Sequence, residues 1–323
     1  MPLSRNTAFG VGAWKPSDGF FNLDERLAKI RVAAGLTLPL APRPIFMADH
    51  RVINHTVFGQ FAFTEAYIRE RFLEMFRGGC TRDGSGSFLF LDSGSNEGTW
   101  SLLAAAHGCK VVAVDPQPLC ISLLEAAAKR SGFSIETHNN ILSPSTLDQR
   151  PMLVPGDQCH GTSEYQVQNR KVSDVTKEGR AQLGRVAPRQ LVYPRAVEDI
   201  IATKRTISLW HLDVEGAEVP VLASARRLFE ERRVERVMLE FIPFRWPSQN
   251  ISMGRGGLRL LDSLFTYSRG WRCSVVCPAH PAHHEKPFNF TMSSVRAHVE
   301  MKNEKGQMRT VCENIYCVDT SLV

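Results

Sequence analysis

From residue 87 onward, short apolar runs alternate with longer segments that carry apolar residues every three or four positions. Runs of the first kind are typical of buried strands, and segments of the second kind are typical of helices. Strands are predicted at residues 87–92, 110–115, 133–138, 206–213, 235–241, 271–277 and 313–319. Helices are predicted at 97–107, 119–130, 217–232 and 257–269. This alternation predicts an α/β fold, in which a seven-stranded, mostly parallel sheet carries helices on both faces.

Two other segments lack this rhythm. Residues 1–58 are irregular, but 59–77 place apolar residues at helical spacing and end at two glycines. We therefore divide the chain into an N-terminal extension, 1–80, with one amphipathic helix, and an α/β domain, 81–323. Residues 143–190 are polar and rich in Pro and Gly. A segment this long inside a domain predicts an insertion or lid between the third and fourth strands.

Composition narrows the class of protein. The chain is 43% hydrophobic and 22% charged, as soluble globular proteins are. No apolar run approaches the roughly 18 residues of a membrane span, and the N-terminus has no signal-peptide core, so a targeting segment is absent or removed. The net charge of +6 is spread along the chain, and we expect no nucleic-acid partner. The oligomeric state is not predicted.

Eight cysteines are spaced unlike zinc ligands, and no metal site is expected. The simplest interpretation is free thiols in a reducing compartment, which favours a cytoplasmic location. Three Asn-X-Ser/Thr motifs, at Asn54, Asn250 and Asn289, make a location in the secretory lumen the alternative. Three histidines at 280, 283 and 284 fit a surface turn better than a metal site.

The turn after the first strand reads DSGSNEG, in which Asp92, Gly94, Asn96 and Gly98 are regularly spaced. It differs from the G-x-G-x-x-G loop, which places a pyrophosphate at a helix N-terminus. Carboxylates at Asp92 and Glu97 would repel that anion and favour a cationic ligand. S-adenosylmethionine carries an ammonium and a sulfonium but no phosphate, so the loop favours it over NAD.

Asp115 ends the second strand, 21 residues after Gly94. An acid at this place can accept hydrogen bonds from both ribose hydroxyls of a nucleoside. Sites for NAD and for S-adenosylmethionine share this feature, so it does not distinguish the two. Asp92 and Asp115 could alternatively be helix-cap or turn residues.

Two blocks of sequence resemble a known family. The stretch FLDSGSNEGTWSLLAAAHGCKVVAVDPQP resembles the first motif of class I methyltransferases, in the version of the FkbM-type family. The stretch ISLWHLDVEGAEVPVLASARRLFEERRVERVMLEF carries a match to that family's D-V-E-G-A-E signature at 213–218. The resemblance covers residues 87–241 and implies a Rossmann-like seven-stranded sheet, S-adenosylmethionine as methyl donor, and commonly an oxygen acceptor.

The resemblance also implies roles for single residues. The methionine half of the donor would contact Asp92, Gly94, Asn96 and Gly98, the ribose would contact Asp115, and the adenine pocket would include Asn139 and Asn140. The chain departs from the family at Ser93 and Ser95, where Val and Ala are more common. Residues 143–190 do not align, which weakens any inference about the acceptor.

Methyl transfer to a hydroxyl requires removal of its proton, so a base or a metal near the donor methyl would help. Asp213, at the carboxyl end of the fourth strand, is the first candidate, and Glu215 is the second. Glu215 and Glu218 could instead cap the following helix. His211 could be a general base or a buried core residue. Residues 240–246 either line an acceptor pocket or cover the sheet edge.

The sequence thus predicts an S-adenosylmethionine-dependent methyltransferase that acts on a hydroxyl of a small molecule or glycan. One alternative is a non-catalytic nucleoside-binding or scaffold protein on the same fold, which the divergent residues 143–190 support. A second is an NAD-dependent oxidoreductase, which the loop carboxylates disfavour.

Overall fold

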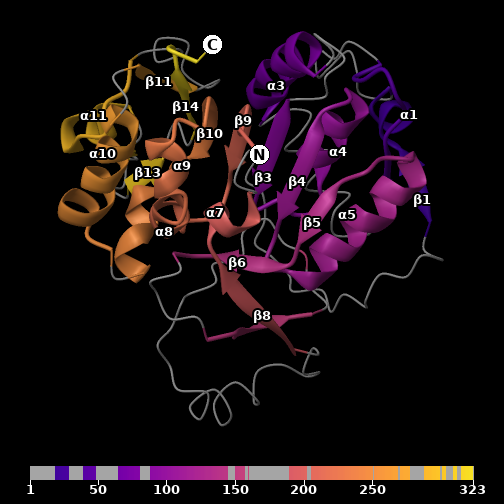
Figure 1. The fold of residues 1–323 in the computed structure, drawn as a ribbon, viewed down its shortest axis with the longest axis horizontal. Helices are drawn as coiled ribbons and strands as arrows, with labels where there is room; N and C mark the ends of the chain where they lie inside the picture. Colours follow the sequence, from indigo (N-terminus) through magenta and orange to yellow (C-terminus); the bar gives the residue numbers. More distant parts are fainter. Residues whose placement is uncertain are drawn as a thin grey trace.

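The computed structural model describes residues 19–28, 39–48, 65–80, 88–144, 150–156, 159, 189–201, 205–249, 251–267, 270–276, 287–298, 300–302, 308–310 and 314–322. Its centre is a seven-stranded sheet in the order β11-β14-β10-β9-β3-β4-β5 (Figure 1). The strands are β3 (Leu89–Ser93), β4 (Lys110–Val114), β5 (Glu136–His138), β9 (Leu209–Leu212), β10 (Arg236–Glu240), β11 (Trp271–Val276) and β14 (Asn314–Asp319). Only β14 runs antiparallel to its neighbours. The predicted α/β fold is confirmed.

The order of the strands defines a ligand-binding edge. From β3 the chain passes to β4 and β5 on one side, and then returns to β9 on the other side of β3. Ligands of open α/β sheets bind outside the carboxyl ends of the strands at such a switch point. The loops after β3 and β9 therefore frame the candidate site.

Apolar residues of the strands alternate between two buried layers. Phe90, Val111, Ala113 and Leu209 pack on one face, whereas Leu91, Val112, Val114 and Trp210 pack on the other. The first face is covered by α3 (Ala66–Gly79), α4 (Thr99–Ala106) and α5 (Pro118–Ser131). The second is covered by α8 (Glu218–Ala223), α9 (Arg226–Glu230) and α10 (Arg259–Tyr267). Helices lie on both faces, as predicted (Figure 1).

The N-terminal extension has more structure than its sequence indicated. The described part contains β1 (Phe20–Asn22), α1 (Leu23–Leu27) and β2 (Phe46–Ala48), and β1 pairs with β2. The Phe46 amide donates to Ser131 Oγ at 2.9 Å, and Arg43 donates to the Gly132 carbonyl. These contacts join the extension to the end of α5. The first residues of the predicted helix, 59–64, lie outside the described residues.

The predicted helix over 217–232 is broken into α8 and α9. At the break, Ser224 Oγ donates to the Val221 carbonyl at 2.6 Å and accepts from the Val197 amide. Serine hydroxyls compete in this way with the helical hydrogen bonds of the backbone. The break lets α7 (Val197–Ile200) pack beside α9.

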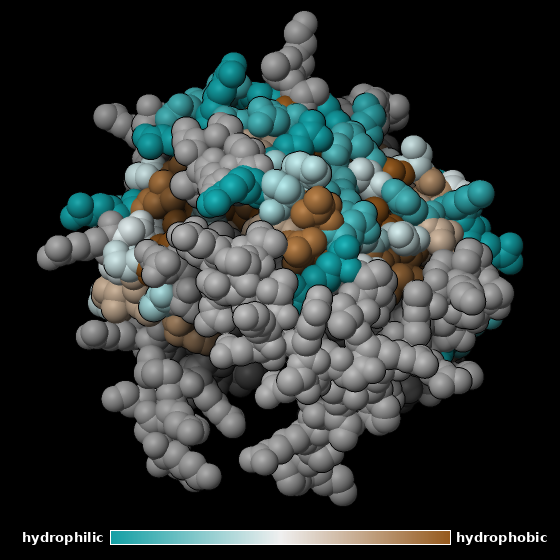
Figure 2. Space-filling view, turned by 90° about the horizontal axis from the view of Figure 1, so that it is seen from below, coloured by the Kyte–Doolittle hydropathy of each residue, from teal (hydrophilic) through white to brown (hydrophobic). Residues whose placement is uncertain are grey.

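Within and on both sides of the predicted insertion, 143–190, the chain forms strands that the sequence did not predict. A three-stranded sheet in the order β6-β8-β7 is built from β6 (Asn140–Leu142), β7 (Met152–Pro155) and β8 (Arg189–Arg195). It lies at the lower end of the molecule in Figure 1. Figure 2 views the molecule from that side, where hydrophobic and hydrophilic surfaces are intermixed. Leu153 and Leu191 are partners across β7 and β8 and are both exposed, so they gave no alternating buried pattern.

The remaining elements follow β10. They are the 3₁₀ helix η3 (Pro243–Gln249), the π-helical turn η4 (Met253–Leu258), α11 (Met292–His298), and the antiparallel pair β12 (Glu300–Lys302) and β13 (Met308–Thr310). Within the described ranges, no helix is both long and apolar enough to cross a membrane.

Cysteine pairing corrects the sequence interpretation. Disulfides join Cys80 to Cys109, Cys120 to Cys159, and Cys273 to Cys317. The expectation of free thiols is therefore wrong for these six, whereas Cys277 and Cys312 lie outside the described residues. Spacing along the chain missed the pairs because they form in space: Cys273 and Cys317 face each other across β11 and β14.

Candidate active site at the carboxyl edge of the sheet

The loop after β3 is fixed to both neighbouring strands. The amides of Gly94 and Ser95 donate to the Val114 carbonyl at the end of β4, at 2.9 and 3.1 Å. On the other side, the Asp213 amide donates to the Ser93 carbonyl at 3.0 Å. These hydrogen bonds join the carboxyl ends of β4, β3 and β9 to one another.

Gly94 and Gly98 are required by close packing within the protein. Both have positive φ, at +79° and +89°. A Cβ at Gly94 would lie 1.6 Å from the Asp213 carbonyl oxygen, and one at Gly98 would lie 2.2 Å from Leu124 Cδ1. The predicted ligand contacts of these glycines remain predictions, since the fold alone explains both residues.

Asp115 ties the loop to β4. Its Oδ2 accepts from the Asn96 amide at 2.9 Å, and its Oδ1 accepts from the Gln117 amide at 2.7 Å. Asn139 Nδ2 donates to the Asp115 carbonyl at 2.9 Å. Burial raises the pKa of Asp115 to about 7, although the two amide hydrogen bonds oppose this shift. The structure thus brings Asp115, Asn96 and Asn139 together at the predicted nucleoside position.

Asp92 lies beneath the loop and is fully buried. Its Oδ2 accepts from Ser101 Oγ at 2.6 Å, and its Oδ1 accepts from His211 Nδ1 at 2.8 Å. Burial acts to lower the pKa of His211, but the hydrogen bond and charge of Asp92 outweigh it and raise that pKa. Each Asp92 oxygen has a partner inside the protein, so its predicted contact with a donor remains a prediction.

His211 belongs to the core. It is 3% exposed and packs edge-to-face against Phe72 at 5.4 Å between ring centroids. Trp100 lies 6.1 Å from it on the same face of the sheet. Of its two interpretations, the buried core residue is the one that this environment favours.

Two side chains of the loop, Glu97 and Ser95, are buried polar groups. Burial raises the pKa of Glu97, against hydrogen bonds from its own amide and from Thr99 Oγ1. Ser95 Oγ is buried and has no hydrogen-bond partner among the described residues. A buried hydroxyl without a partner is costly, and a ligand in the loop would satisfy it.

Asn96 contacts a disulfide next to the loop. It adopts a left-handed conformation, with φ at 52°, and its Oδ1 accepts from the Glu97 amide at 3.0 Å. The same oxygen lies 2.9 Å from Cys159 Sγ and 3.4 Å from Cys120 Sγ. The Cys120–Cys159 bridge therefore fastens part of the insertion beside the loop, which no pattern in the sequence indicated.

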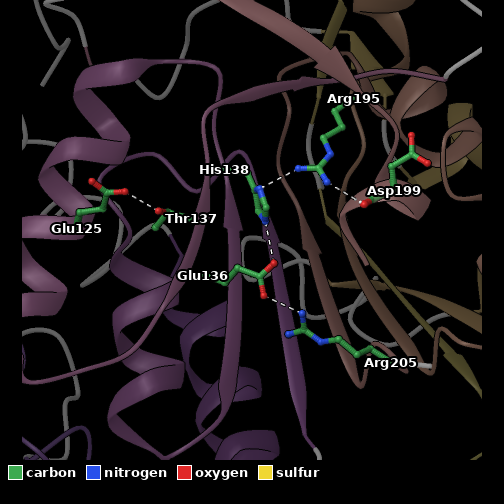
Figure 3. Close-up of polar contacts among 7 residues, drawn as sticks. All are labelled: Glu125, Glu136, Thr137, His138, Arg195, Asp199 and Arg205. Atoms are coloured by element: carbon green, nitrogen blue, oxygen red, sulfur yellow. Dashed lines mark hydrogen bonds and ion pairs between the residues drawn. The ribbon is translucent and has the colours of Figure 1, made fainter. Parts of the chain in front are cut away.

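The edge strand β5 is attached to the insertion by a polar network (Figure 3). Arg195 donates to His138 Nδ1 at 3.3 Å, so His138 Nε2 carries the hydrogen that it shares with Glu136 at 2.9 Å. Glu136 also pairs with Arg205 at 2.8 Å. Asn140 Nδ2 donates to the Tyr193 carbonyl of β8 at 3.0 Å, and its predicted place in the adenine pocket remains a prediction.

Three carboxyl groups meet beyond β9 and β10. Asp213, Glu215 and Glu240 each place an oxygen within 4.8 Å of the other two. Burial raises the pKa of Asp213, against a hydrogen bond with Glu240 and the charge of His211. Burial and the negative charge of Asp213 raise the pKa of Glu240 well above its usual value. Burial also raises the pKa of Glu215 to about 7, while Arg245 opposes the shift.

The D-V-E-G-A-E turn has a defined structure. Glu215 and Gly216 both have positive φ, at 54° and 98°, and Arg245 forms an ion pair with Glu215. Glu218 accepts from the Gly216 amide and from Trp246 Nε1, both at 2.7 Å. Glu218 therefore links the turn to Trp246 through its two hydrogen bonds. The sequence suggested only that Glu218 could cap the following helix.

A cavity of about 360 Å³ lies at the opposite edge of the sheet. Arg43, Lys110 and Arg205 are among the residues that line it, near the amino ends of β4 and β5. None of the predicted site residues contributes to it. The cluster of half-buried acids at the carboxyl edge is the stronger candidate for chemistry.

Comparison with known proteins gives distant structural likenesses only. No protein family matches the chain, and no curated protein matches it. The bifunctional kinase-methyltransferase WbdD is similar at 15% identity and TM-score 0.40, over 82% of this chain and 43% of its own. The plantazolicin methyltransferase BpumL in complex with SAH is similar at 9% identity and TM-score 0.37, over 92% and 98%. A SAM-dependent methyltransferase from Methanosarcina mazei has 12% identity and TM-score 0.26, over 72% and 92%. The chain spans about two fifths of WbdD, and none of these likenesses is strong enough to transfer a function.

Proposed function

We propose that the protein is an S-adenosylmethionine-dependent methyltransferase. The observation that carries the proposal is the acidic loop at the switch point. Glu97 and Asp115 are buried around a loop that contains no Lys or Arg from 92 to 99. His211 compensates Asp92 but faces the core, so the loop remains suited to a cationic ligand. A pyrophosphate would be repelled, which argues against an NAD-dependent oxidoreductase.

The residues present fit the donor. Asp115 accepts one backbone amide at each oxygen, and a carboxylate oxygen has a second lone pair that can accept from a ribose hydroxyl. Ser95 Oγ, which is buried and has no partner among the residues that the structure describes, can bond the polar methionine end. Asn139 lies beside Asp115 and would border the adenine. We propose membership of the FkbM-type family on the resemblance of the two sequence blocks, from which these positions were expected.

The acceptor is proposed to be a hydroxyl of a small molecule or glycan. Its oxygen would attack the methyl carbon of the donor while the carbon–sulfur bond breaks and sulfur takes the electron pair. The hydroxyl proton must leave, and Asp213 and Glu215 are the proposed acceptors. Because burial raises the pKa of Glu215 to about 7, this carboxylate is a stronger base than an exposed one.

A scaffold protein on the same fold is the second candidate. One observation favours it: both oxygens of Asp92 and both of Asp115 already have partners within the protein. On this alternative the acids only shape the loop, and neither S-adenosylmethionine nor its demethylated product would bind.

We further propose an oxidising compartment rather than the cytoplasm. The three disulfides support this, because cytosolic thiols are normally kept reduced. Asn289, in one of the three glycosylation motifs, is exposed. Asn54 and Asn250 lie outside the described residues.

Calorimetry tests the function directly. The protein is titrated separately with S-adenosylmethionine, with its demethylated product and with NAD. We expect saturable binding of the first two and none of NAD. Binding of NAD alone would overturn the proposal, and binding of none of the three would favour the scaffold. Mass spectrometry of extracts incubated with labelled donor then identifies the methylated acceptor.

A further inference from the structure

We propose that Asp213, Glu215 and Glu240 form a binding site for a hard divalent cation. The spacing of Cys and His residues predicted no metal site, and whether a metal assists the transfer was left open by the sequence. The three acids come from the ends of two neighbouring strands and from the turn after one of them, and only the sheet brings them together.

Sheet register explains the convergence. Leu212 of β9 is paired with Leu239 of β10 in a parallel ladder. The next residue on each strand is Asp213 and Glu240, so the two acids stand side by side at the carboxyl edge. Glu215 reaches the same point because the turn takes a left-handed conformation at this residue.

The spacing of the oxygens suits an ion of this kind. One oxygen of each acid lies within 4.8 Å of the others. Two ligands on opposite sides of a cation are separated by about twice the metal–oxygen distance, which is roughly 4.2 Å for Mg²⁺ and 4.8 Å for Ca²⁺. Three oxygens that all lie within this limit can therefore contact one cation.

Glu240 supplies an independent indication of a ligand. Its Oε2 is buried and has no hydrogen-bond partner among the described residues. A buried carboxyl oxygen without a hydrogen-bond partner is rare in folded proteins, because it loses its hydration without a replacement. A cation bound by the three acids would satisfy this oxygen.

The charge around the site is strongly negative. Glu218 adds a fourth carboxyl group, which is fully buried and accepts hydrogen bonds from Trp246 Nε1 and the Gly216 amide at 2.7 Å each. Arg245 is paired with Oε2 of Glu215, so Oε1 is the oxygen that can turn toward a cation. His211 is directed at Asp92. In the described part of the chain, four carboxyl groups thus gather beside the Arg245–Glu215 ion pair.

The ligand chemistry selects the class of ion. All three donors are carboxylate oxygens, with no imidazole or thiolate, which suits Mg²⁺, Mn²⁺ or Ca²⁺ better than zinc or copper. The consequence for catalysis rests on the proposed function. An acceptor hydroxyl that joined the cation would have a lowered pKa and would lose its proton more readily.

Binding of Mn²⁺ alone tests the site, with no donor or acceptor present. Electron paramagnetic resonance measures free Mn²⁺ during titration of the metal-stripped protein. We expect saturation at one ion per chain, and a loss of affinity of about tenfold or more in Glu240→Gln, as for the removal of a charged ligand. The matched control is Glu235→Gln, at the other end of β10, which should bind as the wild type does.

Two results would overturn the site: no saturable binding to the wild type, or equal binding by Glu240→Gln and the wild type. Should Glu240→Gln fail to fold, as judged by near-ultraviolet circular dichroism, Glu215→Gln takes its place with the same expectation. Calorimetry with S-adenosylmethionine in the presence of a chelator separates this proposal from the previous one. Donor binding without the ion would leave the proposed function standing even if the cation site failed.

Discussion

Asp115→Asn tests whether the loop acid is buried at a cost to stability. The structure raises its pKa from 3.8 to about 7, chiefly through burial. The folded protein therefore retains a proton that the unfolded chain has lost, so stability falls as pH rises from about 4 to about 7 and is then constant. The difference between the two pKa values corresponds to about 4 kcal/mol in total.

The substitution removes this titration but keeps the size of the side chain. An Asn amide nitrogen cannot accept a hydrogen bond, so either the Asn96 or the Gln117 amide loses its acceptor. That loss costs about 1–3 kcal/mol at every pH. Between pH 5 and pH 8, ionisation of Asp115 destabilises the folded wild type, and the variant has no such ionisation. The difference in unfolding free energy should therefore move in favour of the variant by about 3 kcal/mol.

Urea denaturation followed by tryptophan fluorescence, at pH values from 5 to 8, measures both proteins. Asp199→Asn, at an exposed carboxylate of α7, is the control and should show no such shift. A difference between Asp115→Asn and wild type that stays constant across this range would refute the reasoning. If Asp115 also binds a ribose, which needs the ionised form, wild-type affinity for the donor should increase as pH rises through about 7.

Three further predictions concern packing. Gly94→Ala should destabilise the protein by several kcal/mol, because the new Cβ would lie 1.6 Å from the backbone. The control, Gly78→Ala, adds a Cβ in open space on α3 and should be neutral or slightly stabilising. Equal melting temperatures of the two variants would contradict this. Trp246→Phe should cost about 1–3 kcal/mol in urea denaturation, since a buried carboxylate loses its donor; an unchanged midpoint would count against that contact. Non-reducing peptide mapping should recover the Cys273–Cys317 bridge, whose removal should cost about 4 kcal/mol for a separation of 44 residues; recovery of free thiols only would contradict the pairing.

The centre of the main sheet was predictable because β3, β4 and β9 are buried on both sides. Leu89 to Leu91 and Val111 to Val114 are continuous apolar runs, and the helices between them keep an apolar face. The small sheet of the insertion was missed for the opposite reason. Leu153 and Leu191 are exposed, so no burial pattern marks their strands.

The candidate site also has features that the sequence predicted and features that it did not. Position after a strand was enough to predict that Asp92, Asp115 and Asp213 gather at one edge, since parallel strands end together. Their partners were not predictable. Ser101 and His211 reach Asp92 from an adjacent helix and strand, and these contacts decide how much of its carboxylate a ligand can use.

The sequence by itself determined the α/β sheet, its ligand-binding edge and the acidic character of its loops. These follow from hydrophobic periodicity and from residues that are neighbours along the chain. Only the tertiary structure decided which cysteines pair, that Glu240 joins Asp213 and Glu215, and that Trp246 supports Glu218. Those relations depend on strand register and on the packing of distant segments, which act across space and leave no local pattern in the sequence.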